Sequence, residues 1–308
     1  MSVLILIERD ESFKINTLKA GVRRGLIELR ELLYRTESGL VGEQLVDQLW
    51  HDFQLQDAYY VLHNYCVDQH QMDTVFLCSR FMLILEIKNI AGRIWFEEEK
   101  AQFLRMREDG IIDSFRNPID QVKRHVRFMT NVVAGRLPVL YAVVFSNPRT
   151  IIGHVPKGEV VFKVSGLESF IRNAMKRYAV KVNDLEQLAQ WLVSKHQIRP
   201  QAIQIDRARI MHGVICSSCT KIMTFQHGKF VCSNCQRNGL EDFYIGLADY
   251  RYLISEWISN QELREFFYVP SEDAARRLLK NLKFEFEGTF KDRKYRICLE
   301  KLKSRVNR

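Results

Sequence analysis

The chain has 308 residues, of which 46% are hydrophobic and 27% are charged. This composition is typical of a globular protein and excludes a largely disordered chain, and the length predicts about two domains. No apolar run approaches the ~20 residues of a membrane helix, and the N-terminus lacks the basic region of a signal peptide. We therefore expect a cytoplasmic protein without a membrane partner. The net charge of +9 is compatible with a polyanionic partner but does not establish one, and the basic excess of residues 281–308 fits a solvated surface equally well.

The chain is expected to begin with helices. Leucine and valine recur at spacings of three and four over residues 12–36, which predicts a helix that Gly39 ends. A second helix is predicted from about Gly42 to His51, with apolar residues on one face.

A series of strands follows, because β-branched and aromatic residues dominate the next segments. A further helix is predicted from Pro118 to about Gly135, with the proline in the first turn, where its missing N–H costs nothing. The run from Pro138 to Ser146 is nearly all apolar, which predicts a strand covered on both faces. The order of elements predicts a mixed α/β domain, and its strands are expected at 59–65, 71–78, 81–88, 93–96, 138–146 and 160–164.

Two of these strands each carry a lone carboxylate, Asp73 and Glu86. If the hairpin turns about residues 79–80, Asp73 lies opposite Glu86 and Gln71 lies opposite Lys88. A turn one residue longer or shorter would send Asp73 to the other face of the sheet. Ser-Arg is not a favoured two-residue hairpin turn, so the register is a prediction to be tested by a structure.

This pair of carboxylates points to metal chemistry. Carboxylates about 5 Å apart on apolar strands need a proton or a cation between them. Mg²⁺ or Mn²⁺ would satisfy both, because such an ion takes one or two protein carboxylates and accepts phosphate oxygens. Lys88 shares a strand face with Glu86, where an ammonium can orient a water, stabilise negative charge, or act as a base if its pKa is lowered. The set suits phosphodiester hydrolysis, and the alternative is that each residue is a strand end reaching solvent.

The order of these residues resembles a known family. Gly42-Glu43 on a helix, Gln71-Met72-Asp73, Glu86-Ile87-Lys88-Asn89 and Asn117-Pro118 with Gln121 resemble the nuclease-related domain (NERD), an offshoot of the PD-(D/E)xK restriction-endonuclease-like superfamily. The resemblance implies a mixed central sheet flanked by helices and a Mg²⁺-dependent nuclease site. It implies Asp73 and Glu86 as metal ligands, Lys88 as the water-orienting group, and Glu43 reaching the metal through water. Gln71 and Gln121 match positions near the site with less defined roles, and residue 74, often His in such domains, is Thr here.

Four cysteines predict a second metal site. Cys216, Cys219, Cys232 and Cys235 form two CxxC pairs that can complete one tetrahedral site, and the segment between them predicts a hairpin around residues 227–228. This resembles a zinc ribbon with structural Zn²⁺, whose closed coordination sphere argues against catalysis at this metal. A redox dithiol pair is the alternative. Buried free thiols are predicted for Cys66, Cys78 and Cys298.

The C-terminal part predicts a helix over 258–267 with Ser259 or Asn260 as N-cap, and a second over 274–282 capped by Ser271. Segments 284–290 and 295–299 can pair as a hairpin. This order resembles a winged helix-turn-helix module, which implies that the second helix enters a DNA groove. The alternative is a protein-interaction module with a solvated basic face. The residues implied to contact nucleic acid are Arg276, Arg277 and Lys280 on the helix and Lys291, Arg293 and Lys294 on the wing.

Together the parts resemble full-length NERD-domain proteins of the Bacillus type. We expect a metal-dependent nuclease that acts on DNA, with the ribbon or tail also open to a protein partner. Two alternatives remain: a non-catalytic nucleic-acid-binding or regulatory protein with a nuclease-like fold, and a protein-scaffold role for the ribbon and tail. The expected segments are an N-terminal helical segment (1–38), a nuclease-like domain (39–165), a helical bridge (166–210), a Cys₄ ribbon (211–240) and a winged-helix-like basic module (241–308).

Overall fold

The structure, a computed structural model, describes residues 4–9, 13–197, 203–289 and 292–306. Its contacts divide the chain into two compact units. Unit 1 comprises Met1–Glu11 and Arg35–Arg199, and unit 2 comprises Ser12–Tyr34 and Pro200–Arg308. The separate folding of the five segments expected from the sequence stays a prediction.

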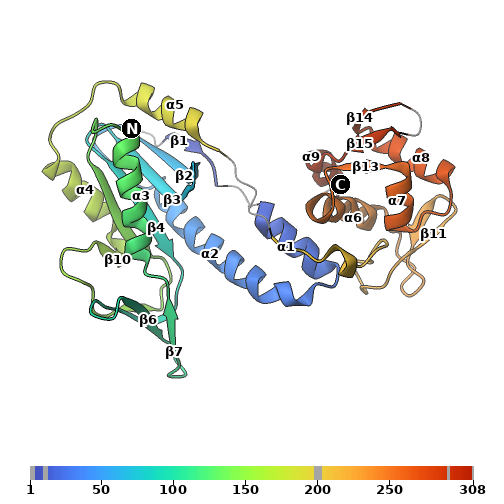
Figure 1. The fold of residues 1–308 in the computed structure, drawn as a ribbon, viewed down its shortest axis with the longest axis horizontal. Helices are drawn as coiled ribbons and strands as arrows, with labels where there is room; N and C mark the ends of the chain where they lie inside the picture. Colours follow the sequence, from blue (N-terminus) through green and yellow to red (C-terminus); the bar gives the residue numbers. More distant parts are fainter. Residues whose placement is uncertain (1–3, 10–12, 198–202, 290–291, 307–308) are drawn as a thin grey trace. The chain divides into compact units, whose positions relative to one another are not determined.

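Unit 1 is built on a six-stranded mixed sheet in the order β1-β2-β3-β4-β8-β10 (Figure 1). The β1–β2, β4–β8 and β8–β10 pairs are parallel, whereas β2–β3 and β3–β4 are antiparallel. The mixed α/β architecture expected from the sequence is confirmed. The strands are β1 (Leu4–Ile7), β2 (Tyr59–Val67), β3 (His70–Cys78), β4 (Met82–Lys88), β8 (Val139–Phe145) and β10 (Val161–Lys163).

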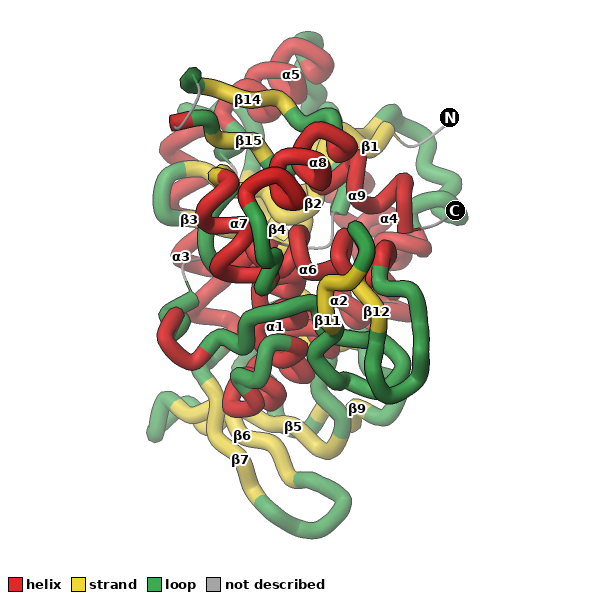
Figure 2. The backbone as a smooth tube through the Cα atoms, turned by 90° about the vertical axis from the view of Figure 1, so that its right-hand side faces the viewer, coloured by secondary structure: helices red, strands yellow, loops and turns green. Residues whose placement is uncertain are grey.

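A smaller four-stranded sheet in the order β7-β6-β5-β9 belongs to the same unit (Figure 2). Only its β5 was expected, because the other strands are short and lack a long apolar run. They are β5 (Gly92–Glu97), β6 (Gln102–Met106), β7 (Ile112–Phe115) and β9 (Thr150–Ile152).

Helices cover both faces of the large sheet. The helices α3 (Pro118–Val132) and α5 (Leu185–Lys195) bury apolar residues against one face, which we call face A. The helices α2 (Arg30–Leu49) and α4 (Leu167–Arg177) bury theirs against the other, face B. Successive residues of β8 alternate between the two cores, so the prediction that this strand is covered on both faces is confirmed.

The N-terminal helices differ from the prediction. The helix expected over 12–36 is interrupted: α1 (Phe13–Arg23) ends before Gly25, and a 3₁₀ turn (Ile27–Leu29) leads into α2. Gly25 has φ +93°, a left-handed conformation that commonly ends a helix. The stop expected at Gly39 was wrong, because α2 runs through it and a glycine inside a helix costs only about 1 kcal/mol relative to alanine. The N-terminal segment expected to be helical, residues 1–38, also contains the strand β1.

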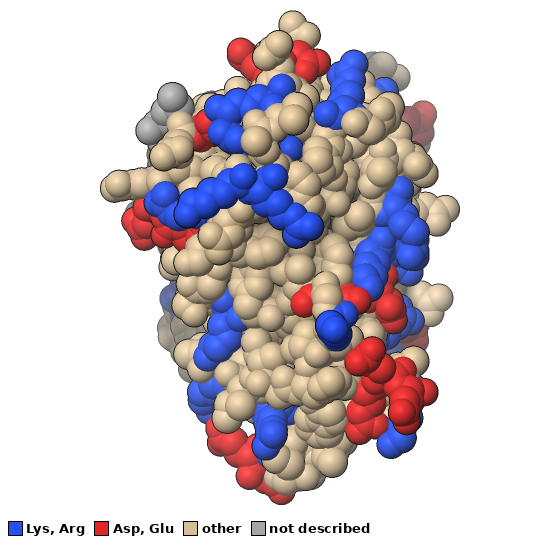
Figure 3. Space-filling model, turned by 90° about the vertical axis from the view of Figure 1, so that its left-hand side faces the viewer, with Lys and Arg blue, Asp and Glu red and all other residues tan. Residues whose placement is uncertain are grey.

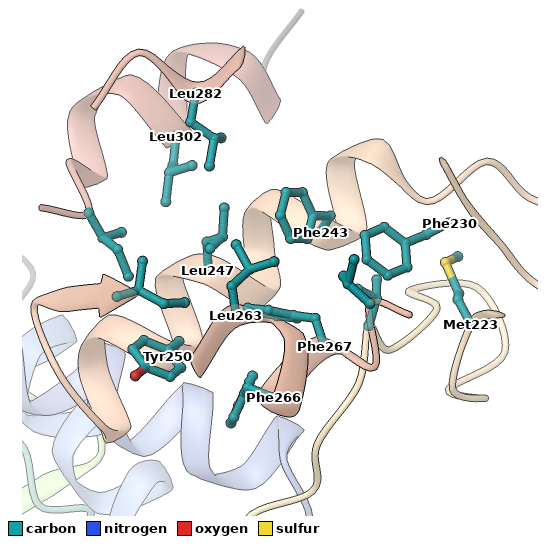
Figure 4. Close-up of a cluster of buried hydrophobic side chains, with 14 of the residues drawn as sticks. Met223, Phe230, Phe243, Leu247, Tyr250, Leu263, Phe266, Phe267, Leu282 and Leu302 are labelled. Atoms are coloured by element: carbon teal, nitrogen blue, oxygen red, sulfur yellow. The ribbon is translucent and has the colours of Figure 1, made fainter. Parts of the chain in front are cut away.

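Unit 2 has one core that joins the cysteine hairpin to the C-terminal module (Figure 4). Met223 and Phe230 from the hairpin pack in the same cluster as Phe243, Phe267 and Leu282. The hairpin therefore has no separate hydrophobic core and shares that of its neighbour. Its strands are β11 (Thr224–Gln226) and β12 (Lys229–Val231).

The C-terminal module has the element order of a winged helix. A helix precedes a strand, two helices and a two-stranded wing, and the three strands form a sheet in the order β13-β15-β14. Ser259 caps the first helix of the pair through a capping box with Glu262, and Ser271 caps the second, as expected. The elements are α6 (Leu240–Leu253), β13 (Trp257–Ser259), α7 (Asn260–Phe267), α8 (Glu272–Leu282), β14 (Glu285–Glu287), β15 (Lys294–Arg296) and α9 (Leu299–Val306).

Two surface properties bear on partners. Among the described residues, no helix combines the length and apolar character needed to cross a membrane. On the face drawn in Figure 3, Lys and Arg form separate bands between acidic and uncharged side chains. On that face the basic side chains therefore do not form one continuous patch.

Candidate functional site

The β3–β4 hairpin has the predicted register. Its ladder pairs Thr74 with Leu85 and Leu77 with Met82, and the turn is closed by a 3.1 Å bond from the Cys78 N–H to the Phe81 carbonyl. Extended by one position, this register sets Asp73 against Glu86. The register expected from a turn at residues 79–80 is therefore confirmed.

The alternation of side chains along a strand assigns Glu86 and Lys88 to face A of the sheet, and it assigns Asp73 to the same face when the register is continued beyond Thr74. The residues two and four positions from Asp73 on β3 lie in the face A core, as do those two and four positions before Glu86 on β4. The β3–β4 ladder ends at Thr74, and the Asp73 carboxylate instead accepts a 2.7 Å hydrogen bond from the backbone N–H of Ile87. This bond fixes one oxygen of Asp73 at the end of β4.

Glu86 and Lys88 form a buried ion pair, with Nζ 2.5 Å from Oε1 and side-chain exposures of 1% for Glu86 and 27% for Lys88. Burial and the charge of Asp73 raise the pKa of Glu86 to about 8, although Lys88 opposes this. Burial alone would lower the pKa of Lys88, but Glu86 and Asp73 together raise it above its ordinary value. Lys88 is therefore an ammonium near neutral pH, which favours the water-orienting role over that of a neutral base.

Glu43 approaches from α2, the helix on face B. Burial and the charge of Asp73 raise the pKa of Glu43 to about 7, against the opposing charges of Arg9 and Lys88. The charge of Glu43 in turn contributes to the raised pKa of Glu86. The three carboxylates and Lys88 thus interact electrostatically, and their roles in a metal site stay predictions.

A close approach sets the position of Glu43. A Cβ on Gly42 would overlap Asn89 and would lie 2.6 Å from Ser146 Oγ, so only glycine lets α2 approach the ends of β4 and β8 this closely. Asn89 also donates a 2.7 Å bond to the carbonyl of Ser38 on the same helix. Gly42 and Asn89 therefore fasten α2 against the strand that carries Glu86 and Lys88.

A buried cation beside these carboxylates was not expected from the sequence. The Arg9 side chain is 3% exposed and forms ion pairs with Glu43 and Asp47, the latter with Nε 2.5 Å from Oδ2. It also donates a 3.0 Å bond to Asn64 on β2. Asp47, four residues after Glu43 on one helix, was detectable as an i,i+4 acidic pair. Nothing in the sequence around Arg9 marks it, because its partners come from elements distant in the chain.

The two glutamines of the expected site come from different elements. Gln71 lies on β3 at the position paired with Cys66 on β2. Gln121 lies in the first turn of α3, the helix that covers face A. Their roles near the site stay predictions.

The carboxylate oxygens of the acidic site do not lie close enough together to form a complete set of metal ligands. Among the described residues, only the four cysteines bring three or more His, Cys, Asp or Glu ligand atoms within 4.8 Å of one another. Each carboxylate instead has a protein donor: Ile87 N–H for Asp73, Lys88 for Glu86 and Arg9 for Glu43. A pair of carboxylates is nevertheless enough for Mg²⁺, which usually keeps several waters.

The four cysteines form a compact cluster. Cys216 Sγ lies 3.5 Å from Cys235 Sγ, and Cys219 Sγ lies 3.4 Å from Cys232 Sγ. Zn–S bonds of about 2.3 Å in a tetrahedron place sulfurs roughly 3.8 Å apart, so this donor set fits one zinc ion. The remaining cysteines are free thiols, of which Cys66 and Cys78 are buried as predicted and Cys298 is half-buried.

The two halves of the cluster are built alike. Each CxxC pair is followed by a residue with positive φ, Thr220 at 61° and Gln236 at 59°. The N–H of that residue bonds back to the carbonyl of the first cysteine, at 2.8 Å for Cys216 and 2.9 Å for Cys232. The hairpin between them turns at residues 227–228, both with positive φ, as a tight two-residue turn requires. The predicted ribbon geometry is confirmed.

The basic residues of the winged-helix module differ in availability. Arg277 and Lys280 are exposed on α8 and Lys294 is exposed on β15, whereas Arg276 forms ion pairs with Glu272 and Asp273 of its own helix. Arg293 stacks over Phe286, 4.5 Å from the ring centroid. Lys291 lies outside the described residues. Contact of these residues with nucleic acid stays a prediction.

Fold and site together define an α/β domain with an acidic, lysine-bearing sheet end, followed by a zinc-ribbon-like hairpin and a winged helix. Residues 38–146 match the family described as NERD, the nuclease-related domain. The matched segment contains Glu43, Asp73, Glu86 and Lys88. Comparisons with curated proteins and with solved structures gave no match.

Proposed function

We propose that this protein is a metal-dependent nuclease that hydrolyses phosphodiester bonds in DNA, with a restriction-endonuclease-like site in unit 1. The observation that carries the proposal is that Asp73, Glu86 and Lys88 meet at the end of β4, where Asp73 accepts a hydrogen bond from the Ile87 N–H and Lys88 pairs with Glu86. The match of residues 38–146 to the nuclease-related domain supports the same interpretation.

The charges at this site support a divalent cation. Glu43, Asp47, Asp73 and Glu86 contribute four negative charges when ionised, and Arg9 and Lys88 contribute two positive charges. One divalent cation would neutralise the residual charge of −2. The raised pKa values of Glu43 and Glu86 have the same origin, since crowded carboxylates in a buried site favour the uptake of positive charge.

In this proposal Asp73 and Glu86 would hold Mg²⁺ or Mn²⁺, and the Glu43 carboxylate would add negative charge beside the ion. The bound ion would polarise the scissile phosphate and make water a better nucleophile. Lys88 orients the attacking water and stabilises the developing negative charge, because its neighbours keep it protonated. The ion pair between Lys88 and Glu86 holds the ammonium at that position before substrate binds.

Unit 2 would supply DNA affinity. Arg277, Lys280 and Lys294 are exposed and able to approach phosphates, and the wing adds Arg293. Arg276 would contribute less, since its own helix already balances its charge. Structural Zn²⁺ would hold the cysteine hairpin on which part of the unit 2 core depends.

The second candidate function is a non-catalytic nucleic-acid-binding or regulatory protein that keeps the nuclease-like fold. The observation that favours it is the internal pairing of the acidic site, where a protein donor contacts Glu43, Asp73 and Glu86. Such internal pairing allows the site to fold without a metal. This candidate predicts DNA binding without cleavage.

Cleavage assays separate the two candidates. Plasmid, duplex, single-stranded DNA and RNA substrates are incubated with Mg²⁺ or Mn²⁺ and with the wild type, Asp73→Ala or Lys88→Ala. We expect cleavage by the wild type and a fall of at least about 100-fold in each variant. Glu97→Gln is the matched control, because Glu97 lies at the end of β5 and pairs with Lys100 in the following turn. This variant should leave the rate unchanged. Equal rates in all four proteins would reveal a contaminating nuclease or a misplaced site.

A further inference from the structure

Arg9 connects elements that the sequence separates by more than sixty residues. It follows β1, and its guanidinium bonds to Asp47 on α2 and Asn64 on β2. Its Nη2 also donates to the backbone carbonyl of Asp73 at 2.8 Å and to Thr74 Oγ1 at 2.9 Å. One side chain thereby joins the helix that carries Glu43 to the strand that carries Asp73.

The geometry around this side chain is specific to arginine. Each of the three guanidinium nitrogens has an acceptor: Nε contacts Asp47, Nη1 contacts Glu43 and Asn64, and Nη2 contacts the β3 backbone. A guanidinium is a planar fork with five donors, whereas a lysine ammonium is a point charge with three. Lysine at this position could supply the charge but could not hold these acceptors in one plane.

The backbone of Asn64, which lies on β2 opposite Asp73, has an unusual conformation. It has φ 48°, in the left-handed region, and it lies between the β2–β3 pairs His63–Thr74 and Tyr65–Met72, opposite Asp73. Asparagine tolerates this conformation better than most residues. Its Oδ1 accepts from Arg9 Nη1 at 3.0 Å, so Arg9 holds both sides of the locally opened ladder beside Asp73.

We propose that Arg9 is a positioning residue of the acidic site, which fixes the Glu43 carboxylate and the Asp73 backbone in one frame and so sets the affinity of the site for a divalent cation. This inference rests on the proposed function, because it assigns Arg9 a role at the same metal site. The proposal assigns Arg9 no direct contact with substrate or metal, because its guanidinium nitrogens are occupied by protein acceptors.

The competing role is that of a simple counter-ion. A counter-ion only neutralises Glu43 and Asp47, so its removal would change the site charge from −2 to −3 and would tighten binding of a divalent cation. A positioning residue has the opposite effect, because its removal releases Glu43 and the β3 backbone from their arrangement. The sign of the change in metal affinity therefore distinguishes the two roles.

The experiment measures Mn²⁺ binding to the full chain by electron paramagnetic resonance. We expect the dissociation constant to rise about tenfold or more in Arg9→Ala, as is typical when a residue supporting metal ligands is lost. Arg9→Lys keeps the charge and should bind Mn²⁺ nearly as weakly as Arg9→Ala. Arg80→Ala is the matched control: it removes another partly buried arginine of unit 1, paired with Asp57 at 2.5 Å, and should leave Mn²⁺ affinity unchanged.

Chemical rescue provides a second readout that a general loss of stability would not move. Millimolar guanidinium should restore part of the Mn²⁺ affinity of Arg9→Ala, whereas methylammonium should not. If Arg9→Ala does not fold, Arg9→Lys decides alone, since wild-type affinity in that variant would show that charge suffices and would overturn the proposal. Unchanged or tighter Mn²⁺ binding in a folded Arg9→Ala would also overturn it.

The outcomes also separate this proposal from the nuclease proposal. A wild type that binds Mn²⁺ and cleaves DNA, with Arg9 variants equal to it, refutes only the role of Arg9. A wild type that binds Mn²⁺ without cleavage refutes the nuclease proposal, while weaker binding in the Arg9 variants still supports the positioning role. A wild type that binds no Mn²⁺ refutes both.

Discussion

The two candidate metal centres of this chain are constructed in opposite ways. The four cysteines lie within residues 216–235, and their sulfurs all lie within 4.8 Å of one another, the shortest distance being 3.4 Å between Cys219 and Cys232. The acidic site draws Arg9, Glu43, Asp73, Glu86 and Lys88 from three elements and the segment after β1, and every carboxylate has a protein partner. The first centre is closed and local, whereas the second is assembled by the fold and balanced by internal cations. A structural metal needs the first arrangement, and an exchangeable catalytic metal is served by the second.

The largest effect is expected from loss of the cysteine centre. Cys232→Ser should abolish stoichiometric zinc and lower the melting temperature of unit 2 by on the order of 10 °C, because the ribbon residues Met223 and Phe230 share its core. Metal analysis of the purified chain and thermal unfolding measure both. Cys298→Ser is the control, since this thiol lies outside the cluster. A full chain that contains no zinc and keeps its melting temperature in strong chelator would break the comparison.

The acidic site should make the stability of unit 1 depend on pH. The pKa of Glu86 rises from an ordinary 4.5 to about 8 in the folded chain, because of burial and the charge of Asp73. The folded state therefore binds a proton that the unfolded state has lost, and this stabilisation is complete below pH 4.5 and disappears as the pH rises through 8. Glu86→Gln should remove that dependence and make metal-free unit 1 a few kcal/mol more stable than wild type at pH 9.

Urea unfolding at pH 6 and pH 9 tests this difference. A Trp257→Phe background leaves tryptophans only at positions 50, 95 and 191, all in unit 1, so their fluorescence reports that unit. The comparison between Glu86→Gln and wild type cancels the titration of groups that do not interact with Glu86, and it retains the part of the Glu43 and Lys88 titration that the Glu86 charge influences. Parallel stability curves for the two proteins would mean that Glu86 carries no shifted proton.

The features that could be predicted from the sequence are mainly those that depend on residues close together in the chain. The cysteine spacing, the wing and its serine caps depend on neighbours in the chain, so local chemistry determines them. The hairpin register followed from placing the turn at residues 79–80, and the observed pairing of Leu77 with Met82 agrees with it. The apolar pattern alone does not set this register, because β3 and β4 are buried on both faces.

The remainder of the acidic site depends on tertiary contacts. Arg9 has no local signal, since its acceptors lie 34 to 65 residues away. Strand β1 was missed because four apolar residues do not establish a period. Gly39 and Gly42 look alike in the sequence, although a Cβ at Gly42 would meet Asn89 and Ser146, whereas a Cβ at Gly39 would meet no described atom within 4 Å.

Substitutions of these two glycines should have effects of intermediate size on the stability of unit 1 and on its Mn²⁺ affinity. Gly42→Ala should destabilise unit 1 by about 1–3 kcal/mol, because the new methyl group forces α2 away from the ends of β4 and β8. It should also weaken Mn²⁺ binding, since Glu43 is the next residue. Gly39→Ala on the same helix should stabilise it by up to about 1 kcal/mol and leave Mn²⁺ binding unchanged. The urea assay and the Mn²⁺ titration measure both variants, and equal effects would mean that the approach of α2 does not set the site.

The smallest effect concerns the winged helix, where internal pairing again determines which charges are available. Arg276 is held by Asp273 at 3.0 Å and by Glu272 at 3.4 Å, whereas Lys280 is exposed on the same helix. If α8 contacts DNA phosphates, Lys280→Ala should weaken binding to a duplex a few-fold and reduce the slope of log affinity against log salt by about 0.9. Arg276→Ala should change that slope by less than half as much, because its charge is already compensated within the helix. Fluorescence anisotropy between 50 and 200 mM salt, roughly the range over which phosphate contacts weaken, measures both slopes. Equal losses would show that the ion pairs of α8 do not restrain Arg276, and no loss in either variant would favour a protein partner for this module.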